Sequence, residues 1–150
     1  MKREINTEPV VEINNVDSSN SRLIPLMENT ISAGFPSPAT DYMSTGIDLN
    51  KELIRNPSST FYGRVKGNSM QEAGIFDGDI IVIDKGLEPE NDDIAVCFIN
   101  GEFTLKRIVV ENNRLVLMPA NKKYKPIVVT QDNTFIVWGI VTYVISKVKK

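Results

Sequence analysis

Two segments of this 150-residue chain carry side chains that could act together in hydrolysis. Ser69 follows a short glycine-containing segment, and Lys106 lies in a strand-like run later in the chain. The chain contains no histidine, so the usual partner of a nucleophilic serine is absent. A hydrolase with this composition needs Lys, Asp, Glu or an amine terminus as its base, and a nucleophilic serine would need a neutral lysine.

Lys106 lies within residues 102–110, where a segment rich in Val, Ile, Phe and Thr after an Asn-Gly pair predicts a β-strand. In a strand Thr104 and Lys106 point to one face while Leu105 and Arg107 point to the other, so one basic residue can face inward. A lysine forced into an apolar site loses the solvation of its charged form, and its pKa falls. A shift from ~10.4 to near 7 costs about 4–5 kcal/mol. Thr104 is placed to orient the amine, although this segment alone favours a solvated lysine on a strand face.

Ser69 lies at the end of a predicted strand, after the flexible Gly67. A serine in such a place can expose its hydroxyl, and backbone N–H groups that begin a helical turn can bind an oxyanion. The alternative is structural, because Ser69 and Glu72 have the spacing of a capping box. Taken alone, this pattern favours a helix cap over a nucleophile.

The composition excludes several other kinds of site. Cys97 is the single cysteine, so neither an intrachain disulfide nor a cysteine–histidine metal site is expected. Asp77-Gly78-Asp79 lacks the further oxygen ligands of a calcium loop and is interpreted as a tight turn. We expect no metal and no cofactor. The net charge of −2 gives no support for nucleic-acid or membrane binding, and neither a signal peptide nor a membrane span is visible, so a cytoplasmic protein is expected.

The chain changes character along its length. Residues 1–22 are polar and are predicted to form a flexible arm. Residues 23–60 contain several prolines and glycines, with one short helix expected near 48–55. An Asn100-Gly101 pair predicts a type I′ hairpin, and Asn112-Asn113 gives a second hairpin signal. The fold class is mainly β with short helical turns, and the expected strands are 61–66, 80–84, 94–99, 102–110, 114–118, 127–129 and 135–146.

These segments together resemble the LexA/UmuD-type self-cleaving serine–lysine peptidases, over roughly residues 24–146. The ordered set of motifs carries the resemblance, since each motif alone is weak. The motifs are Gly34-Phe35-Pro36-Ser37-Pro38-Ala39-x-Asp41-Tyr42, Ile47-Asp48-Leu49-Asn50, Gly67-Asn68-Ser69-Met70, Asp77-Gly78-Asp79, Gly101-Glu102-Phe103-Thr104-x-Lys106 and Trp138-Gly139.

The resemblance implies a fold and a site. The fold is a LexA/UmuD/signal-peptidase-like arrangement of several coiled antiparallel β-sheets with short helical turns. Ser69 is implied to be the nucleophile and Lys106 its base, with Thr104 orienting the base. The Ser69 and Met70 amides are implied to form the oxyanion hole.

The resemblance also implies the bond that is cut, Ala33-Gly34. A small residue followed by glycine can lie close over a dyad as an extended strand.

The implied organisation is an arm at 1–22, a hinge with the self-cleavage site at 23–40 and a serine–lysine peptidase domain at 41–150. The resemblance implies three partners. One is a second copy of the chain in a homodimer. The others are a RecA–single-stranded-DNA filament, which stimulates cleavage in the SOS response, and a UmuC-type polymerase, which uses the product 34–150 in error-prone translesion synthesis. Neither sequence-specific DNA binding nor a membrane is implied.

Three departures from the family pattern and three competing interpretations stay open. The N-terminal arm is longer than expected for a UmuD-type member. Asp92-Asp93 stands where a Gly-Asp turn is more usual, and Ala33 before the cut is typical of LexA-type repressors. The first competing interpretation is a LexA-like repressor relative, which would need a helix-turn-helix, and the residues before Leu23 lack helical periodicity. The second is a non-catalytic dimerisation module, and the third is a signal-peptidase-like enzyme.

Overall fold

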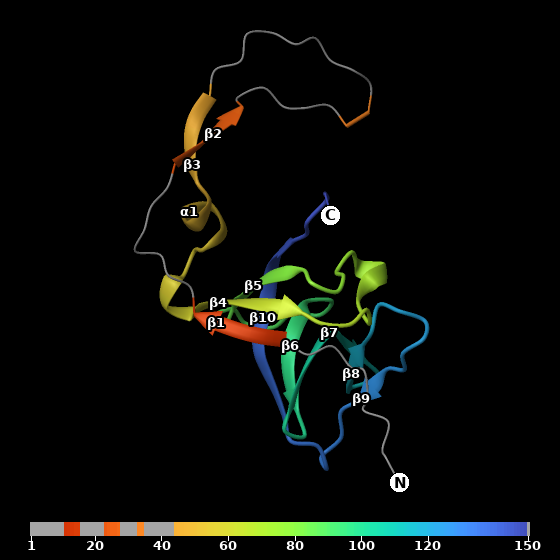
Figure 1. Ribbon diagram of the computed structural model, residues 1–150. Coiled ribbons are helices and arrows are strands. Elements are labelled where there is room, and N and C mark those ends of the chain that lie inside the picture. The colour runs from red at the N-terminus through yellow and green to blue at the C-terminus, as the bar shows by residue number, and fades with distance from the viewer. Residues whose placement is uncertain (1–10, 16–22, 28–32, 35–43, 150) are drawn as a thin grey trace. The chain divides into compact units, whose positions relative to one another are not determined.

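The computed structural model describes residues 11–15, 23–27, 33–34 and 44–149 (Figure 1). These residues belong to two compact units. One unit contains β1 and residues 56–149, and it carries both Ser69 and Lys106. The other contains β2, β3, α1 and the two residues 33–34.

The larger unit is built on one antiparallel sheet of eight strands in the order β1-β4-β5-β10-β6-β7-β8-β9. In Figure 1, β10 lies between β5 and β6 along the sheet, so the last strand of the chain is an interior strand. The strands are β1 (Val11–Asn15), β4 (Thr60–Val65), β5 (Ile80–Asp84), β6 (Ile94–Ile99), β7 (Glu102–Glu111), β8 (Arg114–Met118), β9 (Ile127–Val128) and β10 (Phe135–Ile145), with short 3-10 turns η1 (Pro57–Ser59) and η2 (Gln71–Ala73).

The mainly β, antiparallel fold predicted from the sequence is confirmed. Three predicted strands, at 80–84, 94–99 and 114–118, have the observed bounds, and the others differ by one residue at one or both ends. The hairpin predictions are also correct, since both Asn100 (φ 49°) and Gly101 (φ 83°) lie in the left-handed region. Asn112 (φ 49°) and Asn113 (φ 60°) do the same between β7 and β8, as a type I′ loop requires.

Part of the predicted arm has regular structure. Val11–Asn15 forms β1, which pairs with β4 from Val11 opposite Val65 to Asn15 opposite Phe61. Backbone hydrogen bonding to an existing edge requires little side-chain hydrophobicity, so a polar composition hid this strand. The remaining arm residues lie outside the described part of the chain.

The smaller unit contains an antiparallel pair and a single helical turn. β2 (Leu23–Met27) pairs with β3 (Ser44–Asp48), and α1 (Leu49–Leu53) follows directly. The Asp48 side chain caps this helix by accepting a hydrogen bond of 3.0 Å from the Asn50 amide. The helix is shorter than the predicted span 48–55, because Ile54 already has an extended backbone.

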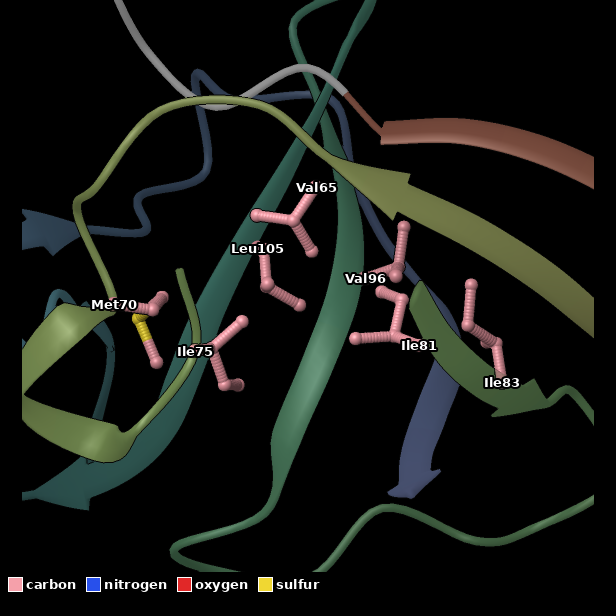
Figure 2. Close-up of a cluster of buried hydrophobic side chains, with 7 residues drawn as sticks. All are labelled: Val65, Met70, Ile75, Ile81, Ile83, Val96 and Leu105. Atoms are coloured by element: carbon pink, nitrogen blue, oxygen red, sulfur yellow. The ribbon is translucent and has the colours of Figure 1, made fainter. Parts of the chain in front are cut away.

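The core of the larger unit consists of two clusters. Figure 2 shows the first, in which Met70 and Ile75 from the η2 region meet Leu105 of β7. The second cluster includes Ala95 and Cys97 of β6 together with residues from β7, β8 and β10. The η2 region is thus held against the sheet by apolar burial, which is the main stabilising term for such contacts. No helix among the described residues is long and apolar enough to cross a membrane.

Gly139 lets β10 lie close to the side chain of Ile83 on the neighbouring strand β5. The register of β10 on β6 shifts between Val137 and Gly139, next to Trp138, which packs edge-to-face on Phe61. A Cβ placed on Gly139 would lie 2.5 Å from Cγ2 of Ile83, a fully buried residue. The close approach therefore requires a residue without a side chain.

We predict that Gly139→Ala lowers the free energy of unfolding by about 1–3 kcal/mol, because Ile83 has no free space to move into. Urea unfolding of both proteins measures this difference. In an Ile83→Ala background the same change should cost clearly less, because the clashing atom is gone. An equal cost in both backgrounds would show that the contact is not the cause.

Candidate active site

Lys106 is fully buried in the middle of β7, where it stands opposite Ala95 of β6. Its Nζ donates a hydrogen bond of 2.7 Å to Oγ1 of Thr104 and one of 3.3 Å to the backbone oxygen of Leu105. The interpretation of Lys106 as a solvated lysine is therefore wrong. Removal from water disfavours the charged ammonium relative to the neutral amine.

Cys97 shares this environment, since it stands directly opposite Thr104 across the β6–β7 pair. Burial raises the pKa of the Cys97 thiol to about 12, and the Lys106 side chain opposes that rise only in its charged form. The thiol is accordingly protonated at neutral pH. It contributes no negative charge that would hold Lys106 in its ammonium form. The prediction that Cys97 is a small buried core residue is confirmed.

Ser69 is also fully buried, and its hydroxyl has no hydrogen-bond partner among the described residues. The capping-box interpretation is wrong, because Met70 is the residue that precedes η2 and no side chain caps that turn. The Glu72 amide bonds instead to the backbone oxygen of Ala120, at 2.8 Å. A buried hydroxyl without a partner is costly for stability alone, and such groups are concentrated where chemistry takes place.

The turn that carries Ser69 is tied at its start and in its middle. Gly67 has a φ of 93°, which favours glycine, and its amide donates to Oδ1 of Asp77 at 2.7 Å. The backbone oxygen of Ser69 accepts a 2.8 Å hydrogen bond from the Ala120 amide. The predicted tight turn at 77–79 is confirmed by Gly78 (φ 87°), and Asp77 thereby supports the Ser69 turn.

The same packing connects the Ser69 turn with β7. Met70 and Leu105, the neighbours of Ser69 and Lys106, belong to one buried cluster (Figure 2). A second connection is through the end of β8, where Met118 pairs with Arg107 and is followed two residues later by Ala120. Both candidate residues are therefore anchored through their neighbours to the same part of the sheet.

The remaining predicted site residues are divided between the two units. Thr104 and Met70 belong to the larger unit with Ser69 and Lys106. Ala33 and Gly34 belong to the smaller unit, and both are exposed. A Cβ placed on Gly34 would meet no atom within 4 Å. Ala33 and Gly34 thus have the exposure that a cleavable segment needs.

A cavity of about 600 Å³ lies beside the Ser69 turn. Its lining combines polar groups from two loops, Gly67, Asn68, Asp77, Lys123 and Tyr124. No group of three or more His, Cys, Asp or Glu side chains suited to a metal ion occurs among the described residues. The sequence did not indicate that Ala120, Asn121 and Tyr124 hydrogen-bond to the Ser69 turn. A loop between two prolines has no periodicity that shows what it contacts.

Comparison with known proteins places this site in a family. The peptidase S24-like family model matches residues 25–142. The MucA protein of Salmonella typhimurium is 40% identical over 121 residues, which cover 80% of this chain and 82% of MucA. The ImpA protein of Shigella flexneri is 39% identical over 126 residues, covering 84% and 86%. A LexA repressor from Clostridium kluyveri is 36% identical over 129 residues, which cover 86% of this chain and 64% of the repressor.

The chain belongs to the peptidase S24-like family. Members of this class are autocatalytic serine peptidases, so the activity expected from the resemblance is confirmed at the level of the family. Within it the chain is UmuD-like, a self-cleaving protein of SOS mutagenesis.

The buried thiol gives a prediction for alkaline stability. The pKa of Cys97 is near 9.0 in the unfolded chain and about 12 in the folded one, so the unfolded state releases its proton first as the pH rises. The free energy of unfolding therefore keeps its full contribution from Cys97 below about pH 9 and loses it between about pH 9 and 12. At about pH 10.5 the loss should be about 2 kcal/mol relative to pH 8.

Urea unfolding of the natural chain and of Cys97→Ala at both pH values measures this effect. The variant should lose less stability between the two pH values, because it lacks the thiol while all other groups titrate as they do in the natural chain. Identical losses would mean that Cys97 does not resist ionisation.

Proposed function

We propose that Ser69 and Lys106 form the catalytic dyad with which this chain cuts its own Ala33-Gly34 bond. The observation that carries the proposal is the complete burial of a lysine amine and a serine hydroxyl in one unit, with the hydroxyl lacking a partner among the described residues. Thr104 supports the assignment, because its hydroxyl accepts a hydrogen bond from the amine and so orients it.

The reaction follows from these roles. Lys106 Nζ takes the proton of Ser69 Oγ, and Oγ attacks the carbonyl carbon of Ala33. The Ser69 and Met70 amides bind the oxyanion that develops on Ala33. The bond to Gly34 breaks as the Lys106 ammonium returns its proton to the leaving nitrogen. Water, deprotonated by Lys106, then hydrolyses the ester that joins Ala33 to Ser69.

The buried lysine gives the reaction a pH dependence. Only the neutral amine can accept the proton of Ser69, so the rate should rise from acidic to alkaline pH until Lys106 is fully neutral. The Thr104 hydroxyl can accept the hydrogen bond from the amine over this whole range, because threonine does not ionise. Met70 is 1% exposed and is suited to the wall of a small pocket for Ala33.

We further propose the cellular role that this activity implies. A RecA–single-stranded-DNA filament stimulates the cut, and the product 34–150 acts with a UmuC-type polymerase in error-prone translesion synthesis in the cytoplasm. The similarity to MucA and ImpA supports this role. A homodimer is supported by exposed apolar side chains near the end of β10, at Tyr143, Val144 and Ile145.

The first test is the mass of the chain after incubation at alkaline pH. Cleavage removes residues 1–33 and leaves a product of 117 residues, 34–150. Ser69→Ala and Lys106→Ala should stay full-length, because one lacks the nucleophile and the other lacks the base. The exposed residues Ser58 and Lys66 provide matched controls, and Ser58→Ala and Lys66→Ala should cleave normally. Formation of the product by both dyad variants would refute the assignment.

Thr104 provides a second test. Thr104→Val removes the hydroxyl that holds the amine, and misplacing a catalytic group should slow formation of the product by roughly ten- to hundredfold. Thr104→Ser retains a hydroxyl at the same atom position and should recover most of the rate. Equal rates for the Val and Ser variants would show that the hydrogen bond to Lys106 has no role in the reaction.

A further inference from the structure

Asn121 is a buried polar residue that lies next to the Ser69 turn and is not part of the dyad. Its Nδ2 donates a 2.8 Å hydrogen bond to the backbone oxygen of Asn68. Its Oδ1 accepts a 3.0 Å hydrogen bond from the Lys123 amide. The side chain thus has two separate functions, one toward the Ser69 turn and one within its own loop.

The bond to Asn68 fixes a peptide plane that matters for the reaction. The backbone oxygen of Asn68 belongs to the same planar peptide unit as the N–H of Ser69, and in a trans unit the two point in opposite directions. No cis peptide bond occurs among the described residues. A hydrogen bond that holds the Asn68 oxygen therefore also sets the direction of the Ser69 N–H.

The neighbouring residue performs the equivalent function on the next peptide unit. The Ala120 amide donates to the Ser69 oxygen at 2.8 Å, and that oxygen shares its plane with the Met70 N–H. Consecutive residues of one loop thus hold the two units whose N–H groups form the proposed oxyanion hole. The Gln71 amide also donates to the Asn68 oxygen, at 3.3 Å, but it belongs to the turn itself and cannot anchor that turn to the sheet.

We propose that Asn121 is a positioning residue that aims the Ser69 N–H at the developing oxyanion, through its hydrogen bond to the Asn68 oxygen. This inference rests on the proposed function of Ser69 and Lys106. It assigns the loop after β8 a role in the reaction, which its sequence does not indicate.

Substitutions at Asn121 separate its two hydrogen bonds. Asn121→Asp retains an acceptor for the Lys123 amide but cannot donate to the Asn68 oxygen, whereas Asn121→Ala loses both bonds. Both variants should lower the alkaline plateau of the self-cleavage rate by roughly ten- to hundredfold, since loss of an oxyanion donor altogether costs about 10²–10³. For Asn121→Ala, which adds no charge, the pH at half-maximal rate should stay unchanged, because the contacts of Lys106 are intact.

Asn133 provides a matched control in a loop away from the turn. Its Oδ1 accepts a 2.8 Å hydrogen bond from the Thr130 amide, as Oδ1 of Asn121 does from Lys123. Asn133→Ala should leave the plateau within about twofold of the natural chain.

The outcomes of these substitutions are distinct. A normal plateau for Asn121→Asp would overturn the inference, even with a slow Asn121→Ala, because loop shape would then be the cause. The inference would also be overturned if the cleavage rate of a variant fell only as much as its folded fraction does. If Ser69→Ala cleaves normally, the proposed function fails rather than this inference alone.

A measurement on the natural chain keeps the inference testable if the variants do not fold. In NMR a scalar coupling across the hydrogen bond should connect the side-chain nitrogen of Asn121 with the carbonyl carbon of Asn68. Absence of that coupling in a protein whose backbone hydrogen bonds give measurable couplings would overturn the inference.

Discussion

The removal of the Lys106 amine from water is the constraint on which the site depends. Lys106 is fully buried on an interior strand, where Thr104 two residues earlier accepts its hydrogen bond. Desolvation favours the neutral amine, and a neutral amine is the form that can act as a base. Cys97, opposite Thr104, has a pKa of about 12 and so introduces no anion beside the amine. In the proposed mechanism the sheet thereby provides the base that histidine supplies in other serine peptidases.

The remainder of the larger unit holds the turn that carries Ser69, the proposed nucleophile, against the same part of the sheet as this strand. Met70 and Leu105 share one core cluster, and the loop after β8 contacts the Ser69 turn through backbone hydrogen bonds. The two catalytic candidates are 37 residues apart in sequence but are anchored to the same part of the sheet. A fold that uses β-sheet pairing in this way can keep the site preorganised, while residues 33–34, the proposed cleavage site, belong to a separate unit.

Much of the fold could be predicted because its signals are local. Short runs of apolar residues rich in Val and Ile identified the strands at 80–84 and 94–99, and the Asn100-Gly101 pair identified the hairpin before Lys106. β1 was missed because its pairing depends on the edge of β4 rather than on its own side chains. Asp92 adopts a φ of 73° where the family more usually has glycine, which explains how the departure at that loop is tolerated.

The site was predicted less completely. Ser69 and Lys106 each had a more ordinary interpretation, as a cap and as a surface lysine, and only the ordered motifs outweighed both. Burial distinguishes the catalytic from the ordinary interpretation, and burial depends on contacts between distant segments that no local pattern encodes. Asn121 illustrates the same limit, since its partner Asn68 is 53 residues away.

The most direct test of this account is the protonation state of Lys106 itself. NMR of the natural chain with labelled lysine side chains can follow the Cε signal of Lys106 against pH, with Lys106→Ala for assignment. The account predicts that Lys106 loses its proton well below the ordinary lysine pKa of about 10.4, over the range in which self-cleavage accelerates. Titration of Lys106 in the ordinary lysine range would contradict it, because the amine would then be an ammonium where the chain cuts itself.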